Sequence, residues 1–263
     1  MHPQRSPLII ELRDNVAILT LNRPEKRNAL NDELVSALHD FFSEPPREVA
    51  AVILQGSGDH FCSGLDLGEV VEKNRSPMEV IRHSRGWHRT FDLMQFGDVP
   101  VIGCLKGGVI GGGLELAAAT HVRICEPSTF FQLPEGQRGI FLGGGGSVRV
   151  PRIIGVGRVV EMMLTGRRYD VSEGIGLGLG HRLATDGGGL AVALDVAKLV
   201  TGNLPTSNYA IINGIARISE MGPAEGLFSE TMTALMTGSA LESRGRIQAF
   251  LDRKNGRGSG TAK

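Results

Sequence analysis

Residues 106–115, with the sequence KGGVIGGGLE, join an apolar strand to a helix through three consecutive glycines. The strand is predicted over residues 99–105 and the helix from Leu114 to about Thr120, which places Glu115 in the first helical turn. A carboxylate suits the dipole at that end of a helix, so Glu115 alone would be interpreted as structural. A second acid, Glu135, follows another predicted strand and a proline. Both acids therefore stand at strand ends, where active sites are commonly built.

The order of strand, strand and helix recurs along the chain up to about residue 186. Apolar runs on both sides of Asp14 predict a hairpin, and Asn31 can cap the helix that follows it. Beyond residue 187 the apolar spacing becomes almost purely helical. We therefore expect an α/β body with the active site at residues 1–186 and a helical region at residues 187–263. Further strands are expected at residues 50–54, 99–105, 122–125 and 129–132.

The predicted helical region carries apolar residues on more than one face. Leu227, Phe228 and Leu235 recur at helical spacing behind Pro223, which suits a helix start. A capping box at residues 239–242 opens the last helix, and the tail from residue 255 is expected to be disordered. So much apolar surface exceeds what the body needs as a cover, which predicts self-association.

Composition excludes several classes of protein. The chain has 263 residues with equal numbers of basic and acidic residues, 28 each, so no overall charge attracts it to nucleic acid or to an anionic membrane. Its three cysteines are widely spaced and form neither a disulfide framework nor a zinc site, and no metal is expected. The sequence shows neither an apolar signal segment at its N-terminus nor a run of ~18 apolar residues, and the expected location is the cytoplasm.

Two glycine-containing loops are candidates for holding an oxyanion. Residues 61–66, FCSGLD, follow a predicted strand, and Gly64 permits close approach of a ligand while the Ser63 N–H is expected to point out of the turn. The amides of Gly111, Gly112 and Gly113 lack partners at the start of the second helix. Two such donors that converge on one oxygen stabilise a developing negative charge, and one donor contributes roughly 10² to 10³ in rate.

Together these motifs resemble the crotonase, or enoyl-CoA hydratase/isomerase, superfamily. The resemblance implies an α/β fold made of a spiral of strand, strand and helix turns, followed by a helical trimerisation region. It also implies a homotrimer or a dimer of trimers. The matching stretches are residues 21–31, 61–66, 111–115, 134–135, 164–166 and 249–254.

The resemblance also implies a reaction, the hydration of a 2-enoyl-CoA thioester to a 3-hydroxyacyl-CoA. The amides of Ser63 and Gly112 would hold the thioester oxygen, Glu115 would take a proton from water, and Glu135 would deliver a proton to C2. Two carboxylates around one water cannot both ionise freely, so they are expected to share a proton. Coenzyme A enters only as part of the substrate, and no separate cofactor is implied.

Local cations must bind the phosphates of coenzyme A, since the total charge is zero. Lys26 and Arg27 match the family's CoA-binding stretch. Phe250 would lie against the adenine, and Arg253 matches a basic residue supplied by a neighbouring subunit. The loop residues Ser63, Gly64, Leu65 and Asp66, together with Gly112, complete the implied contacts, and Asp66 also fits a helix N-cap.

Alternative functions remain open from the sequence. Double-bond isomerisation or thioester hydrolysis would reuse the oxyanion loops, and some crotonase-like proteins bind RNA or act as trimeric scaffolds. The absence of net positive charge argues against RNA binding. No complete dinucleotide fingerprint, Walker loop or Gly-x-Ser-x-Gly motif occurs.

Several residues carry narrower expectations. Trp87 and Phe91 lie one helical turn apart and would line either the acyl pocket or the core. His60 is expected to be exposed to solvent, and Cys62 to be a buried, unreactive thiol. The sequence departs from many hydratases at Leu142 and at residues 136–138, where Arg138 could lower the pKa of Glu135 or reach a polar acyl group.

Overall fold

The computed structural model describes residues 6–239 and 241–254. They belong to two compact units, the first ending at Thr201 and the second beginning at Gly202. The tail predicted to be disordered, residues 255–263, and Ala240 of the predicted capping box lie outside the described residues. Among the described residues, no helix is long and apolar enough to span a membrane.

A six-stranded sheet organises the first unit, in the order β1-β2-β3-β4-β6-β9. The first two strands form the predicted antiparallel hairpin, and the remaining neighbours pair in parallel. Its strands are β1 (Leu8–Arg13), β2 (Val16–Leu21), β3 (Ala51–Gly56), β4 (Val101–Leu105), β6 (Val122–Cys125) and β9 (Arg182–Leu183).

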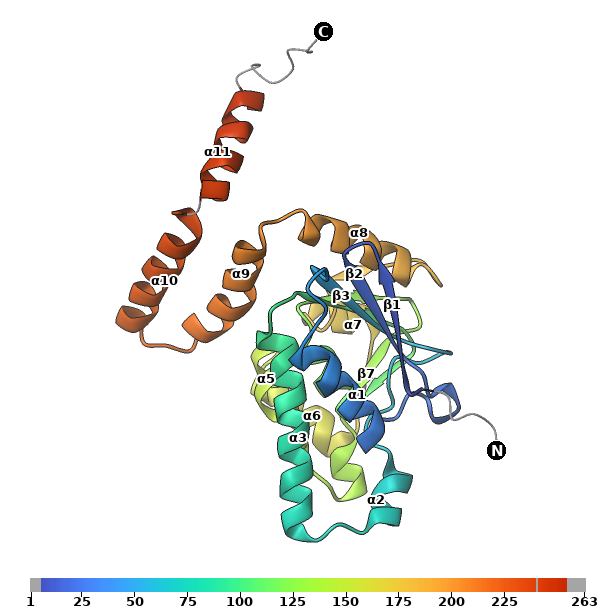
Figure 1. Ribbon diagram of the computed structural model, residues 1–263. Coiled ribbons are helices and arrows are strands. Elements are labelled where there is room, and N and C mark those ends of the chain that lie inside the picture. Colours follow the sequence, from blue (N-terminus) through green and yellow to red (C-terminus); the bar gives the residue numbers. More distant parts are fainter. Residues whose placement is uncertain (1–5, 240, 255–263) are drawn as a thin grey trace. The chain divides into compact units, whose positions relative to one another are not determined.

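Both faces of this sheet are covered, as parallel strands require. On β2, Ala17 and Leu19 belong to one apolar cluster, and Val16 and Ile18 belong to the other. Helix α8 (Gly189–Thr201) covers the second cluster with Ala193, Val196 and Ala197, and it belongs to the first unit. The first cluster lies under α1 (Asp32–Ser43) and α3 (Pro77–Phe96), which lie side by side in Figure 1.

A smaller sheet of three strands accompanies the first. It consists of β5 (Gly108–Ile110), β7 (Phe130–Gln132) and β8 (Arg168–Asp170). Two residues separate β4 from β5 and four separate β6 from β7, and in both cases the second strand belongs to the smaller sheet. This is the recurring strand, strand and helix order that the sequence predicts.

Short helices carry the chain between these strands. Asn31 caps α1 as predicted, since its Oδ1 accepts a hydrogen bond from Leu34 N at 3.1 Å. The other helices of the first unit are the 3₁₀ helices η1 (Pro24–Lys26) and η2 (Glu135–Arg138) and the α-helices α2 (Leu67–Lys73), α4 (Gly112–Ala118), α5 (Gly146–Ile154), α6 (Val156–Thr165) and α7 (Val171–Gly176).

The second unit, whose described residues begin at Gly202 rather than at the predicted residue 187, is helical. It contains α9 (Pro205–Ile218), α10 (Pro223–Gly238) and α11 (Leu241–Lys254), and α9 packs against α10. Leu227, Phe228 and Leu235 on α10 are each more than 60% exposed. An oligomeric role for residues 187–263 stays a prediction.

Candidate active site

Glu115 is held by a glycine loop at the start of α5. Its Oε1 accepts hydrogen bonds from the N–H groups of Gly144 at 2.8 Å and Gly146 at 2.7 Å. A side chain at Gly146 could not fit, because a Cβ there would lie 2.6 Å from Glu115 Cγ. The carboxylate is thus fixed by main-chain donors from a loop distant in sequence.

Burial and hydrogen bonding act in opposite directions on Glu115. The residue is only 2% exposed, and this burial raises the pKa of its carboxyl group above the usual value. The backbone N–H groups of Gly146, Gly144 and Gly143 favour the anion and partly oppose that shift.

Glu135 is the first residue of η2, directly behind Pro134. It is 5% exposed, and its Oε2 is buried without a hydrogen-bond partner among the described residues. Burial raises the pKa of Glu135 to about 7, and the charge of Glu115 acts in the same direction. Arg138 lowers this pKa as the sequence suggested, but its effect is weaker than that of burial.

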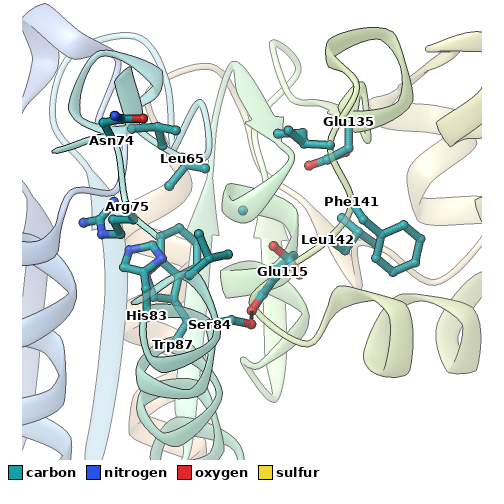
Figure 2. Close-up of a pocket in the computed structure, with 15 residues that line it drawn as sticks. Leu65, Asn74, Arg75, His83, Ser84, Trp87, Glu115, Glu135, Phe141 and Leu142 are labelled. Carbon is teal, nitrogen blue, oxygen red and sulfur yellow. Dashed lines mark hydrogen bonds between the residues drawn. The ribbon is translucent and has the colours of Figure 1, made fainter. Parts of the chain in front are cut away.

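Both glutamates line one cavity of about 520 Å³ (Figure 2). The α3 helix forms one wall, and Trp87 lies there with His83 and Ser84. Phe91 is fully buried in the core, so only Trp87 of the two aromatic candidates reaches the cavity. Most of the remaining wall is apolar, formed by Leu65, Val70, Val80, Ile140, Phe141 and Leu142.

A second cavity of about 410 Å³ adjoins the first and carries most of the charge. The two cavities share Leu65, Glu135 and Ile140 as lining residues. The predicted CoA contacts Lys26, Arg27, Ser63, Gly64 and Asp66 line it together with Arg138, which the sequence analysis did not assign to CoA.

The prediction that the Ser63 amide is an oxyanion donor is wrong. Its N–H donates to the backbone oxygen of Arg27 at 3.0 Å, so it is already occupied. This partner comes from another part of the chain, which the local FCSGLD pattern could not reveal. The Leu65 N–H, two residues further on, has no acceptor among the described residues, and Leu65 lines both cavities.

The Gly112 amide is open, as predicted for an oxyanion donor. It is the first residue of α4, and its N–H has no acceptor among the described residues. Gly64 brings the two loops together, because a Cβ on Gly64 would lie 3.0 Å from Gly112 N. With a φ of +89°, Gly64 also adopts a conformation that favours glycine. The amides that this arrangement leaves open belong to Leu65 and Gly112.

Comparison with known proteins agrees with this geometry. The family model described as enoyl-CoA hydratase/isomerase matches residues 11–255. The chain belongs to the enoyl-CoA hydratase/isomerase family. It is 32% identical over 248 residues to YngF of Bacillus subtilis, provisionally named an enoyl-CoA hydratase/isomerase, with 92% of this chain and 93% of that protein covered.

Two further relatives extend the comparison. A solved structure provisionally assigned as an enoyl-CoA hydratase of Rhodopseudomonas palustris is 47% identical, with a TM-score of 0.92 and coverage of 96% of this chain and 97% of that one. The alpha subunit of a fatty acid oxidation complex from Shewanella halifaxensis is 33% identical over 172 residues, which cover 63% of this chain and 24% of that subunit. The fold is therefore that of the crotonase superfamily.

Three other residues that the sequence analysis considered lie near the site of this enoyl-CoA hydratase/isomerase family member, namely Asp66, Cys62 and His60. Asp66 caps α2 and pairs with Arg23 at 2.8 Å, which gives it a structural role beside the second cavity. Cys62 is buried, and burial raises the pKa of its thiol to about 12, in line with an unreactive cysteine. His60 was expected to be exposed to solvent, but it is partly buried. Its Nδ1 accepts a hydrogen bond from Gly108 N at 2.9 Å.

Phe250 and Arg253 lie on α11 in the second unit, and both are exposed. Their assignment to coenzyme A depends on a neighbouring subunit and stays a prediction.

Proposed function

We propose that this protein adds water to a 2-enoyl-CoA thioester to give a 3-hydroxyacyl-CoA, reversibly, in fatty-acid or related acyl-CoA catabolism. The observation that carries the proposal is the placement of Glu115 and Glu135 on one cavity beside two unoccupied backbone amides. Isomerisation and hydrolysis need the amides but do not need two acids around one water, so the pair favours hydration.

The thioester oxygen accepts hydrogen bonds from the N–H groups of Leu65 and Gly112. As the water oxygen bonds to C3, the C2–C3 π electrons move toward the thioester carbonyl, and these donors stabilise the resulting enolate. Glu115 takes a proton from the attacking water, and Glu135 gives a proton to C2. The sum is one water added, with the two carboxyl groups having exchanged their protonation states, and a proton then returns from Glu115 to Glu135 through solvent.

The hydrogen bonds support Glu115 as the acid that begins as the base. Two N–H groups stabilise the anion of Glu115, whereas Oε2 of Glu135 has no donor among the described residues. With a pKa of about 7, Glu135 holds its proton for a substantial part of the time at neutral pH. We therefore assign the shared proton of this coupled pair to Glu135 before water attacks.

Coenzyme A occupies the second cavity. Lys26 and Arg27 bind its phosphates, with Arg138 as a third cation on the same cavity. Phe250 and Arg253 of a neighbouring subunit contact the adenine end, which makes a homotrimer or a dimer of trimers part of the binding site. The acyl group enters the apolar cavity beside Trp87.

A substrate panel tests this function. Crotonyl-CoA and longer, branched and aromatic 2-enoyl-CoA thioesters are incubated with the enzyme, and loss of the enoyl ultraviolet absorbance is followed. Mass analysis of the product then separates the possible reactions, since hydration adds one water, isomerisation adds nothing and hydrolysis releases free CoA. A product of unchanged mass, or free CoA as the main product, would contradict hydration.

A further inference from the structure

The loop formed by Gly143, Gly144, Gly145 and Gly146 is anchored on its carbonyl side as well as on its amide side. While the amides of Gly144 and Gly146 hold Glu115, Gly143 O accepts a hydrogen bond from Ser84 Oγ at 2.6 Å. Gly144 O accepts one from Arg149 Nη1 at 3.2 Å. Four consecutive glycines have a large conformational freedom of their own, so these external bonds fix the direction of the amides.

Arg149 uses every nitrogen of its guanidinium group in this arrangement. Besides the bond to Gly144, Nε donates to Gln95 Oε1 at 2.6 Å, and Nη2 pairs with Asp92 Oδ1 at 2.5 Å. Its side chain is only 8% exposed. A planar fork with three separate acceptors joins the glycine loop to α3, which a lysine could not reproduce.

The same guanidinium packs against the loop. A Cβ on Gly145 would lie 2.2 Å from Arg149 Nη1, and Gly145 has a φ of +94°. The loop conformation and the position of Arg149 therefore depend on each other. By contrast, Arg152 on the same helix is exposed.

We propose that Arg149 is a positioning residue that holds the glycine loop so that its amides aim at Glu115 and keep this acid ready as the base. The inference rests on the proposed role of Glu115. Arg149 itself does not touch the substrate, since it lines neither cavity. Ser84 supports the same loop from the neighbouring carbonyl.

Charge acts in the same direction as geometry. The charged and titratable groups around Glu115 and Arg149 are Arg152 on α5, His88 and Asp92 on α3, and Glu135 on η2. Burial lowers the pKa of Arg149, while the charges of Asp92 and Glu115 oppose that shift. Loss of the guanidinium would remove both a nearby cation and the orientation of the two amides, and each loss favours the protonated form of Glu115.

The test compares Arg149→Gln and Arg149→Lys with Arg152→Gln, which makes the matched change at an exposed position of the same helix. For Arg149→Gln we expect kcat at neutral pH to fall roughly 10- to 100-fold with KM nearly unchanged, since a small misplacement of a catalytic group can cost 10² in rate. The acidic limb of the kcat profile should move to higher pH by about one unit, and part of the rate should return at high pH. Arg149→Lys should fall between Arg149→Gln and wild type, and Arg152→Gln should match wild type.

A second measurement does not need turnover. Trp87 is the single tryptophan of the chain, and a Cβ on Gly144 would lie 3.0 Å from its ring, so its fluorescence reports on this loop. We expect a pH-dependent change in wild type that disappears in Glu115→Gln and moves to higher pH in Arg149→Gln. This titration tests the inference even if the enzyme proves to catalyse another reaction of the family.

Three results would overturn the inference. One is a wild-type kcat profile in Arg149→Gln, another is a rate loss of equal size at every pH, and the third is an unchanged fluorescence titration. If Arg149→Gln does not fold, Ser84→Ala replaces it, with the same direction and a smaller shift expected; a wild-type titration in Ser84→Ala would then reject the anchored loop.

Discussion

Glu115 and Glu135 line the same cavity, but Glu115 receives two backbone hydrogen bonds whereas Glu135 has a buried oxygen with no partner. Burial raises the pKa of both carboxyl groups, and backbone donors oppose that shift in both, through the glycine loop for Glu115 and through its own N–H for Glu135. An asymmetric pair of this kind can keep one proton on a defined side. This difference underlies the assignment of the base and the acid.

Removal of either acid should slow hydration without loss of the fold. Glu115→Gln and Glu135→Gln keep the size of the side chain, and each should lower kcat by roughly 10²- to 10⁴-fold, the usual contribution of one acid or base. The measurement is the initial rate with crotonyl-CoA, and Glu33→Gln on the exposed start of α1 is the control. Turnover at the wild-type rate in both variants would remove the proposed mechanism.

Gly64 should tolerate no side chain. In Gly64→Ala the new Cβ would lie 2.7 Å from Ile110 O and 3.0 Å from Gly112 N, at a φ of +89°. We expect kcat to fall by at least ~10²-fold, because the oxyanion donors separate. Gly187→Ala is the matched control, with a φ of +68° and no atom within 4 Å of its Cβ, and it should cost only about 1–2 kcal/mol of stability. Equal activity in the two variants would argue against the two-amide site.

Loss of the cations on the second cavity should weaken binding and leave the chemistry intact. Lys26→Ala, Arg27→Ala and Arg138→Ala should each raise KM for crotonyl-CoA by roughly tenfold, since a charge-assisted hydrogen bond contributes about 1.5–3 kcal/mol. The effect should shrink at high salt. Arg13→Ala on the exposed end of β1 should leave KM unchanged. A fall in kcat at constant KM would place these residues elsewhere in the mechanism.

Glu135 should make the stability of the protein depend on pH. Its folded pKa of about 7 exceeds the ordinary value of 4.5, so the folded state retains a proton that the unfolded chain releases. The free energy of unfolding of the wild type should therefore fall as pH rises from about 4.5 to 7. The Glu135→Gln variant lacks this pH-dependent contribution. Urea unfolding should show Glu135→Gln gaining up to roughly 3 kcal/mol over wild type between pH 4 and pH 8. A constant difference across this range would contradict the raised pKa.

The exposed apolar side chains of α10 should support an oligomer. Light scattering after size exclusion should give about three or six times the 28.1 kDa chain mass. Phe228→Lys combined with Leu235→Lys, at positions 66% and 62% exposed, should dissociate it. Ile10→Lys, which changes an exposed apolar residue of β1, should not. A monomeric wild type at micromolar concentration would contradict the trimer.

Local chemistry made much of the fold predictable. The turn at Asp14, the cap at Asn31 and the helical spacing behind Pro223 each depend on neighbours in sequence. The orientation of a backbone amide depends on more distant residues. Because Ser63 N donates a hydrogen bond to Arg27 O, the N–H that remains open in this loop is that of Leu65 and not that of Ser63. The glycine loop at residues 143–146 likewise lies far from Glu115 in the sequence. Its hydrogen bonds to that carboxylate could not be inferred from the four glycines alone. Glu135 could be predicted as a site residue because a strand and a proline precede it in the sequence.

The meeting of the two cavities at Leu65, Glu135 and Ile140 has a consequence for inhibitor design. A weak apolar fragment for one compartment and a weak polyanionic fragment for the other would sit on opposite sides of a shared boundary. A linker of suitable length turns their second contact into an intramolecular event, with an effective concentration that can reach the millimolar range. The tethered compound would then bind far more tightly than either half.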